Sequence, residues 1–105
     1  MNCVKEKWSA SAGIYVLASI KVNSKPHWLQ EGGDDAIWYD NAWTNWKLGL
    51  LSKSTAKLQT DKANTGTAFP HETSWKYLLN GDWTVSDDII VTVVEGNIVL
   101  IVYRN

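Results

Sequence analysis

Alternating apolar and polar positions occur along much of this chain and predict short β-strands. Residues 13–22 alternate with a period of two, which is typical of a strand. The apolar set on one face is Ile14, Val16, Ala18, Ile20 and Val22. The other face carries Tyr15, Leu17, Ser19 and Lys21. Residues 23–26 read as a turn that ends in proline, and 27–30 as a short strand.

The segment from Ala36 to Leu51 is predicted to form a hairpin that turns at residues 40–43. An even-length loop sorts its side chains into two sets. The apolar face carries Ile37, Tyr39, Trp46, Leu48 and Leu50. The second face carries Trp38, Asp40, Trp43, Asn45 and Lys47. Because antiparallel sheets commonly have one face in solvent, we expect this second, aromatic and polar face to be exposed.

A second hairpin is predicted from Ile89–Val94 and Ile98–Tyr103, with a turn at residues 95–97. One face carries Ile89, Val91, Val93, Ile98, Leu100 and Val102. The other carries Ile90, Thr92, Val94, Val99, Ile101 and Tyr103. Both faces are apolar, so the hairpin is either covered on both sides or meets another subunit on one side.

The remaining signals complete an all-β prediction. Residues 54–63 are predicted to form one or two helical turns, and 75–79 a strand followed by an Asn-Gly turn into residues 83–85. We expect a single domain over residues 1–105, with about six to eight antiparallel strands in a small barrel or twisted sheet stack. One short helix completes this expectation.

Composition excludes several classes of protein. A chain of 105 residues with 45% hydrophobic content indicates one folded domain. The net charge of −1 and the lack of a basic run argue against nucleic-acid binding, and no apolar stretch is long enough for a membrane span. The single Cys3 precludes an intrachain disulfide and fits a reducing compartment, cytoplasmic if Met1 is the native start. A mature secreted domain without its leader would look the same.

Seven tryptophans are many for a domain of this size, and flat rings at the surface serve recognition. We predict a binding platform of Trp28, Trp38 and Trp43, with orienting polar contacts from Asp40, Asn45 and Lys47. Stacking rings beside amides and carboxylates suit sugars or short peptides. The alternative is that these rings cover a small core. The phase of Trp46, Trp75 and Trp83 assigns them to the core.

Signals for chemistry are unspecific. The acidic loop of Glu31, Asp34 and Asp35 offers oxygen ligands for calcium but lacks a calcium-loop pattern, which favours a solvated loop. The two histidines, His27 and His71, lack zinc-site spacing. We predict no metal and no cofactor. A small hydrolase would draw on Asp87, Asp88, His71 or Cys3, and no nucleophile motif supports it.

Several residues also occur in a recurring order. They are Gly13-Ile14-Tyr15, Lys25-Pro26-His27-Trp28, Ile37-Trp38-Tyr39, Trp46-Lys47-Leu48-Gly49, Pro70, Trp75, Trp83 and Asp87-Asp88-Ile89. This order resembles small tryptophan- and tyrosine-rich β modules of multidomain proteins, over about Gly13 to Val93. The resemblance implies a compact β fold and binding rather than catalysis, and it carries over no functional residues.

The sequence therefore predicts a non-catalytic module that binds a carbohydrate or short peptide through surface tryptophans. One alternative is an assembly protein that forms a homodimer through Ile89–Val94 and Ile98–Tyr103. A small hydrolase is the other alternative.

Overall fold

A computed structural model describes residues 9–53, 55–60, 70–72, 74–79, 81–85 and 89–102 of the chain. These residues form nine strands and three short 3-10 helices, so the all-β prediction is confirmed and the expected number of strands was too low. The strands are β1 (Gly13–Leu17), β2 (Trp28–Gln30), β3 (Ala36–Asp40), β4 (Asn45–Leu50), β5 (Thr55–Thr60), β6 (Trp75–Leu79), β7 (Asp82–Val85), β8 (Ile89–Val94) and β9 (Asn97–Val102). The 3-10 helices are η1 (Ser9–Ser11), η2 (Leu51–Lys53) and η3 (Pro70–Glu72).

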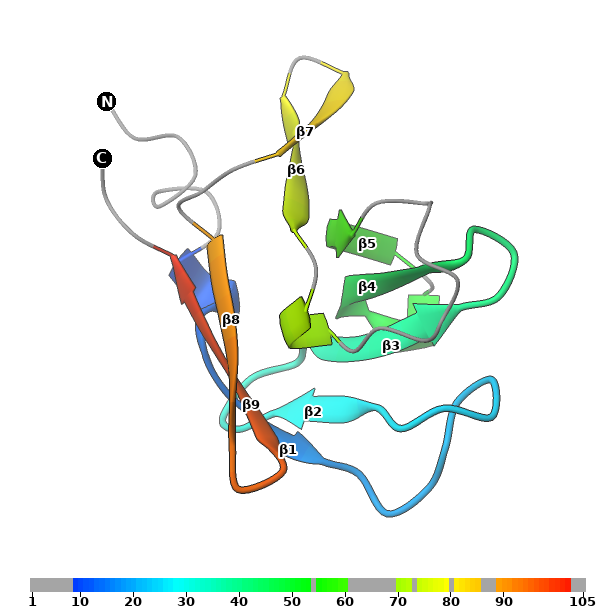
Figure 1. Cartoon of the computed structure of the whole chain (residues 1–105), viewed down its shortest axis with the longest axis vertical. Helices are drawn as coiled ribbons and strands as arrows, with labels where there is room; N and C mark the ends of the chain where they lie inside the picture. The colour runs from blue at the N-terminus through cyan, green and yellow to red at the C-terminus, as the bar shows by residue number, and fades with distance from the viewer. Residues whose placement is uncertain are drawn as a thin grey trace.

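All nine strands belong to one antiparallel sheet in the order β7-β6-β5-β4-β3-β2-β1-β9-β8. Figure 1 shows the sheet curling into a half-barrel, with β8 and β9 standing across from β4 and β5. The short helix η3 packs near β8 on the inner side of this curl. The curl gives the sheet an inner face that holds the core and an outer face that does not.

Large aromatic side chains fill the inner face. The buried cluster consists of Tyr15, Trp28, Ile37, Tyr39, Trp46, Leu48, Leu58, Trp75, Ile89, Ile98 and Leu100. The Trp46 ring centre lies 5.8 Å from that of Trp28 and 5.3 Å from that of Tyr39, in the tilted and edge-on geometries that aromatic pairs prefer. The core assignments of Trp46 and Trp75 are confirmed, whereas Trp83 on β7 is only partly buried and lies outside this cluster.

Both predicted hairpins form with the predicted pairing. In the β3–β4 hairpin, Ile37 pairs with Leu48 and Tyr39 with Trp46 on the inner face. The β8–β9 hairpin turns through Glu95 and Gly96, which both have positive φ, 53° and 84°. Two successive positive φ angles are typical of the type I′ turn, whose twist matches the twist of the flanking strands.

Strand β1 buries the face that carries Tyr15. Tyr15 is fully buried, whereas Ile14 and Val16 on the opposite face are exposed. A tyrosine ring buries more apolar area than a branched aliphatic side chain, and its hydroxyl must find a partner inside. Here the Tyr15 hydroxyl donates to the Ser11 carbonyl at 2.6 Å, so the polar atom costs little. The strand also ends at Leu17, earlier than predicted.

The predicted helix at residues 54–63 is wrong over the part that the structure describes. Residues Thr55–Thr60 form β5, which pairs with β4 and β6. Threonine at both ends of this strand favours a β conformation, and neighbouring strands on both sides satisfy its backbone. Residue 54 and residues 61–63 lie outside the described part of the chain.

Candidate functional site

The predicted aromatic platform is not assembled at the surface. Trp28 is 6% exposed and Trp38 is 4% exposed, so the expectation that they reach solvent is wrong. Trp28 belongs to the inner face, where its indole nitrogen donates to the Gly96 carbonyl at 2.9 Å. Trp38 lies on the outer face as predicted and pairs with Lys47, but both side chains are buried from solvent there.

The polar residues of the predicted site bind one another. The Lys47 Nζ donates to Asn45 Oδ1 at 3.1 Å and to Gln59 Oε1 at 3.3 Å, and lies 3.7 Å from Asp40 Oδ2. Burial lowers the pKa of the Lys47 ammonium, and the Asp40 carboxylate offsets part of this shift. The Asn45 Nδ2 donates to the Thr60 carbonyl at 3.2 Å. Asn45 and Lys47 are therefore structural groups that a ligand would not reach.

Of the six predicted site residues, all within the described part of the chain, Trp43 alone is more than half exposed, at 56%. Its position is fixed by the hairpin turn. The Asp40 Oδ1 accepts from the backbone nitrogens of Ala42 and Trp43, at 2.9 and 3.1 Å, as in a turn capped by an aspartate. The Lys47 Nζ lies 5.6 Å from the Trp43 ring centre, a cation–π contact.

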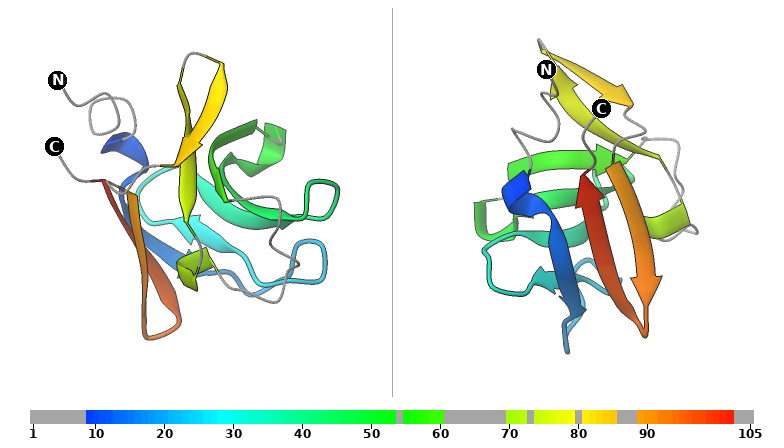
Figure 2. Two further views of the ribbon diagram at one scale, coloured as in Figure 1. Left: turned by 45° about the horizontal axis from the view of Figure 1, so that its top comes forward. Right: turned by 90° about the vertical axis from the view of Figure 1, so that its left-hand side faces the viewer.

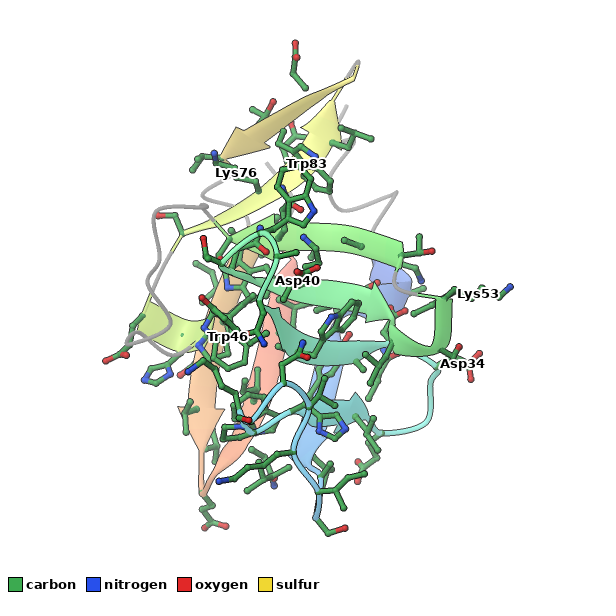
Figure 3. The ribbon with its side chains drawn as sticks, turned by 90° about the vertical axis from the view of Figure 1, so that its right-hand side faces the viewer. Asp34, Asp40, Trp46, Lys53, Lys76 and Trp83 are labelled. Atoms are coloured by element: carbon green, nitrogen blue, oxygen red, sulfur yellow. The ribbon has the colours of Figure 1, made fainter. Side chains whose placement is uncertain are left out.

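A polar pocket of about 430 Å³ lies at the other end of β3, away from Trp43. Figure 3 labels Asp34, in the loop that precedes β3, and Asp40, at the end of β3. The pocket is lined by Ala10, Gln30, Gly32, Gly33, Asp34, Asp35, Leu50 and Lys57. This pocket brings together residues from distant parts of the sequence.

A buried carboxylate lies at the centre of the pocket wall. Asp35 is 3% exposed, and its Oδ1 lies 2.9 Å from the Lys57 Nζ. Its Oδ2 accepts from the Ser11 hydroxyl at 2.6 Å. Burial, and in second place the Asp35 charge, raises the pKa of Tyr15, whose hydroxyl donates to the carbonyl of the same Ser11. A solvated loop was expected over residues 31–35: residues 31–34 are exposed, whereas Asp35 is buried against Lys57, so the expectation is wrong for Asp35.

A β-bulge places Lys57 in the pocket. Leu48 pairs with Leu58 and Gly49 with Ala56, so Lys57 is the extra residue between the two pairs. Bulges re-aim a side chain relative to the alternation of the strand. Gly49 is needed at this point because a Cβ there would collide with the Thr55 carbonyl oxygen.

The loop that borders the pocket is held by Gln30. Its Oε1 accepts from the Asp35 backbone nitrogen at 3.2 Å, and its Nε2 donates to the carbonyls of Ala10 and Ala12, at 2.8 and 3.3 Å. A Cβ at Gly33 would collide with the Gln30 side-chain amide, so glycine makes this arrangement possible. The loop between β2 and β3 and the helix η1 are thereby connected into one wall.

Sequence reasoning missed this pocket because no motif connects its members. Ser11 and Asp35 are 24 residues apart, and Lys57 is on a third element. The surplus residue of the bulge leaves no trace in the alternation pattern, and a buried aspartate looks like a loop aspartate. The one available signal was the Gly-Gly pair before Asp34, which marks a tight loop.

The residues named for a hydrolase are only partly described. Cys3, Asp87 and Asp88 lie outside the described residues, and His71 is exposed on η3. His71 lines a smaller, apolar pocket of about 220 Å³ together with Trp28, Pro70, Val93 and Gly96. Within the described ranges, no group of three or more histidine, cysteine or acidic side chains is placed to hold a metal ion.

Comparison with known proteins gives no relative. No protein-family model matches the chain, and neither a curated protein nor a solved structure matches it significantly. In the part of the chain that the structure describes, no helix has the length and apolar character that a membrane span requires.

Proposed function

We propose that this protein is a non-catalytic binding module for a small, hydroxyl-rich ligand of the carbohydrate class, bound in the polar pocket beside β3. The observation that carries the proposal is the Lys57 ammonium at the pocket wall, held by the buried Asp35. An ammonium has three donors, and the Lys57 Nζ pairs with the Asp35 Oδ1 as an ion pair, without a hydrogen bond to that oxygen among the described contacts. The Lys57 side chain is 32% exposed, so a ligand can reach its ammonium.

The balance of charge in the pocket favours a neutral ligand. The lining carries one ammonium, from Lys57, and two carboxylates, from Asp34 and Asp35, so its formal charge is negative and disfavours an anion. A hydroxyl group both donates and accepts. It can accept from Lys57 and donate to the exposed Asp34, which an anion cannot do. The pocket volume of about 430 Å³ lies in the range of small-ligand sites.

The groups near the pocket support binding rather than catalysis. The Ser11 hydroxyl is buried and donates to Asp35, so it faces the carboxylate and is shielded from a ligand. A nucleophilic serine needs a base that accepts its proton and an open side toward the substrate. Lys57, the basic group nearby, is instead ion-paired with Asp35.

The exposed Trp43 remains the second candidate contact, at the opposite end of β3. A ring held by a capped turn and a cation beneath it loses little freedom when a sugar or a peptide side chain stacks on it. The two candidate sites do not share residues, so single substitutions separate them.

Titration of the labelled protein with mono- and disaccharides and short peptides, followed by NMR amide shifts, tests the proposal. A saccharide is expected to shift the amides of Gly32 and Gly33, and Asp34→Asn is expected to weaken binding about tenfold, because one charged hydrogen bond is lost. Asp82→Asn, another exposed aspartate on β7, is the matched control.

Lys57→Gln is expected to abolish binding, with Lys53→Gln on η2 as its control. Because Lys57→Gln leaves Asp35 buried without its cation, its fold must be checked by circular dichroism. If a ligand shifts only the amide of Trp43 and Asp34→Asn does not change its affinity, the binding site lies at the hairpin turn and not in the pocket. If no saccharide shifts any amide, the proposal fails.

A further inference from the structure

Strand β8 forms one end of the described sheet, so one of its edges has no neighbouring strand there. In an antiparallel pair, opposite residues alternate between hydrogen-bonded and non-hydrogen-bonded pairs. Val94 and Asn97 flank the two-residue turn and form a hydrogen-bonded pair, so the next pair, Val93 with Ile98, is of the other kind. The backbone N–H and C=O groups of Val93, and two residues earlier those of Val91, therefore point away from β9.

This free edge is open toward the hairpin turn. Ile89 is buried, Val91 is partly buried and Val93 is 40% exposed, and no described residue pairs with the last two on that side. The right-hand view of Figure 2 shows β8 next to β9, with η3 and β6 on its other side but not paired with it. Natural sheets commonly protect an edge with proline, a charge or a bulge. Strand β8 has none of these, and its register with β9 is continuous.

An apolar pocket of about 220 Å³ adjoins the open part of the edge. Val93 and Gly96 line it from the hairpin, Pro70 and His71 from η3, and Trp28 from β2. The Trp28 indole nitrogen already donates to the Gly96 carbonyl, so these two polar groups need no ligand. A cavity of about 150 Å³ lined by apolar side chains is large enough to bind benzene. The pocket therefore has room for one apolar side chain.

The charges near the pocket restrict which partner fits. Among the described residues of η3 and of the β8–β9 hairpin, the acidic residues are Glu72 and Glu95, and there is no lysine or arginine. Both glutamates are exposed, and each follows or precedes a residue that lines the pocket. Complementary charge steers association and suppresses wrong partners, so this region favours a basic partner over an acidic one.

We propose that the open edge of β8 binds an extended peptide as an added antiparallel strand, with one apolar side chain in the pocket and basic residues flanking it. Main-chain hydrogen bonds to Val91 and Val93 supply affinity, and the pocket selects the side chain, as in other cases of strand addition. A strand backbone matches this edge because it carries donors and acceptors at the same repeat of two residues. The site shares no residue with the polar pocket, so the inference goes beyond the carbohydrate proposal and does not depend on it.

NMR titration of the labelled protein with the end-capped peptide Lys-Thr-Val-Thr-Leu-Thr-Lys tests this proposal. The peptide is expected to shift the amides of Val91, Val93 and Gly96 and the indole N–H of Trp28. Opposite residues of paired strands point to the same face, so the valine and leucine of the peptide lie opposite Val91 and Val93. Their N–H groups then point toward β8, whereas those of the threonines point away from it.

N-methylation of the peptide separates strand addition from simple occupation of the pocket. A methyl group on nitrogen removes the donor, as the ring of proline does. Methylation at the valine and the leucine is expected to weaken binding about tenfold or more, because the hydrogen bonds to β8 are lost. The matched control is methylated at two threonines and should bind as the unmodified peptide does.

A second pair of variants tests the location on the protein. Val93→Lys is expected to weaken binding about tenfold, because an ammonium then lies against the apolar pocket and repels the basic peptide. Val85→Lys is the matched control, since Val85 is 50% exposed on β7, at the opposite end of the sheet. It should bind as the unaltered protein does. Circular dichroism establishes that both variants are folded.

Three outcomes would overturn the proposal. The first is the absence of amide shifts with the peptide at about 1 mM. The second is equal binding of the two methylated peptides, which would mean that the pocket accepts a side chain without strand addition. The third is a shift of the Val91 and Val93 amides on concentration of the protein alone, which would mean that a second copy of the chain occupies the edge.

Discussion

Two outer faces of the same sheet contrast with each other. On the β3–β4 hairpin, the outer face carries Trp38, Asn45 and Lys47, and it is buried. On β8, the outer face carries Ile90 and Val94, and it is exposed. Composition would assign these faces the other way round, with the polar one in water and the apolar one covered.

The contrast shows that polarity alone does not decide burial. The β3–β4 face tolerates burial because its polar atoms are satisfied: Lys47 binds Asn45, Gln59 and Asp40. The hairpin turn also brings the Trp43 ring over Lys47. The outer side chains Ile90 and Val94 on β8 have no polar atoms to satisfy, so contacts with the rest of the chain alone decide whether they are buried.

The largest expected effect comes from Trp38→Ala. Truncating a buried tryptophan is expected to reduce the free energy of unfolding by about 3–5 kcal/mol, because a large cavity remains. Trp43→Ala removes the same side chain from a site that is mostly exposed, and is expected to cost under about 1 kcal/mol. Urea denaturation followed by circular dichroism measures both. Equal, small losses would mean that the hairpin's outer face is open.

The buried ammonium of Lys47 gives the next effect. Lys47→Ala leaves the Asn45 and Gln59 oxygens without their donor, and we expect a loss of about 2 kcal/mol in the free energy of unfolding. Lys53→Ala on η2 is the control, because Lys53 is exposed, and should stay within about 0.5 kcal/mol. If Lys47→Ala leaves the free energy of unfolding unchanged, water must reach the Asn45 and Gln59 oxygens.

Much of this contrast was accessible from the sequence. Alternation predicted both hairpins and placed Trp38 and Lys47 on one face, because a period of two fixes which residues share a face. It also identified the β8–β9 hairpin as apolar on both sides. What lies against each face depends on segments remote in the sequence, and alternation holds no information on that. Trp38 was therefore placed on the correct face but in the wrong environment.

The pocket and strand β1 were out of reach for a related reason. Tyr15 turned inward because its hydroxyl meets the Ser11 carbonyl, a contact that depends on how η1 folds back. Lys57 reaches Asp35 through a bulge opposite Gly49, and the pattern of residues 54–63 suggested a helix instead. The helix expected over residues 54–63 is a case in which tertiary contacts outweigh local propensity.

A smaller effect concerns Tyr15 and alkaline pH. Its folded-state pKa is raised above the ordinary 10.0, so the stability that it contributes is complete below pH 10 and decreases as pH rises further. Tyr15→Phe is expected to cost about 1 kcal/mol at pH 7 through the lost hydrogen bond to Ser11. Above pH 10 this difference in the free energy of unfolding should shrink. Only the unaltered chain has a phenol at position 15, and ionisation of that phenol favours the unfolded state.

Urea denaturation of both proteins between pH 7 and pH 11 measures this difference. Ultraviolet absorbance of the phenolate is a second readout, since Tyr15 should ionise only with unfolding. A constant difference across the range would contradict the burial of this hydroxyl.

The smallest effect is expected on the outer face of β8. Ile90→Ala removes a side chain that is already 39% exposed, so the protein should lose no more than about 1 kcal/mol in the free energy of unfolding. Urea denaturation followed by circular dichroism measures this loss. A loss as large as that expected for Trp38→Ala would contradict the exposure of Ile90.

Hydroxyl-radical footprinting with residue-resolved mass spectrometry tests the contrast between the two outer faces most directly. The account predicts that Trp38 is protected at every protein concentration while Trp43 is oxidised. It also predicts that Ile14 and Leu29, which are exposed on the outer face of β1 and β2, are oxidised. Oxidation of Trp38 at the rate of Trp43, or protection of Ile14 and Leu29, would contradict it.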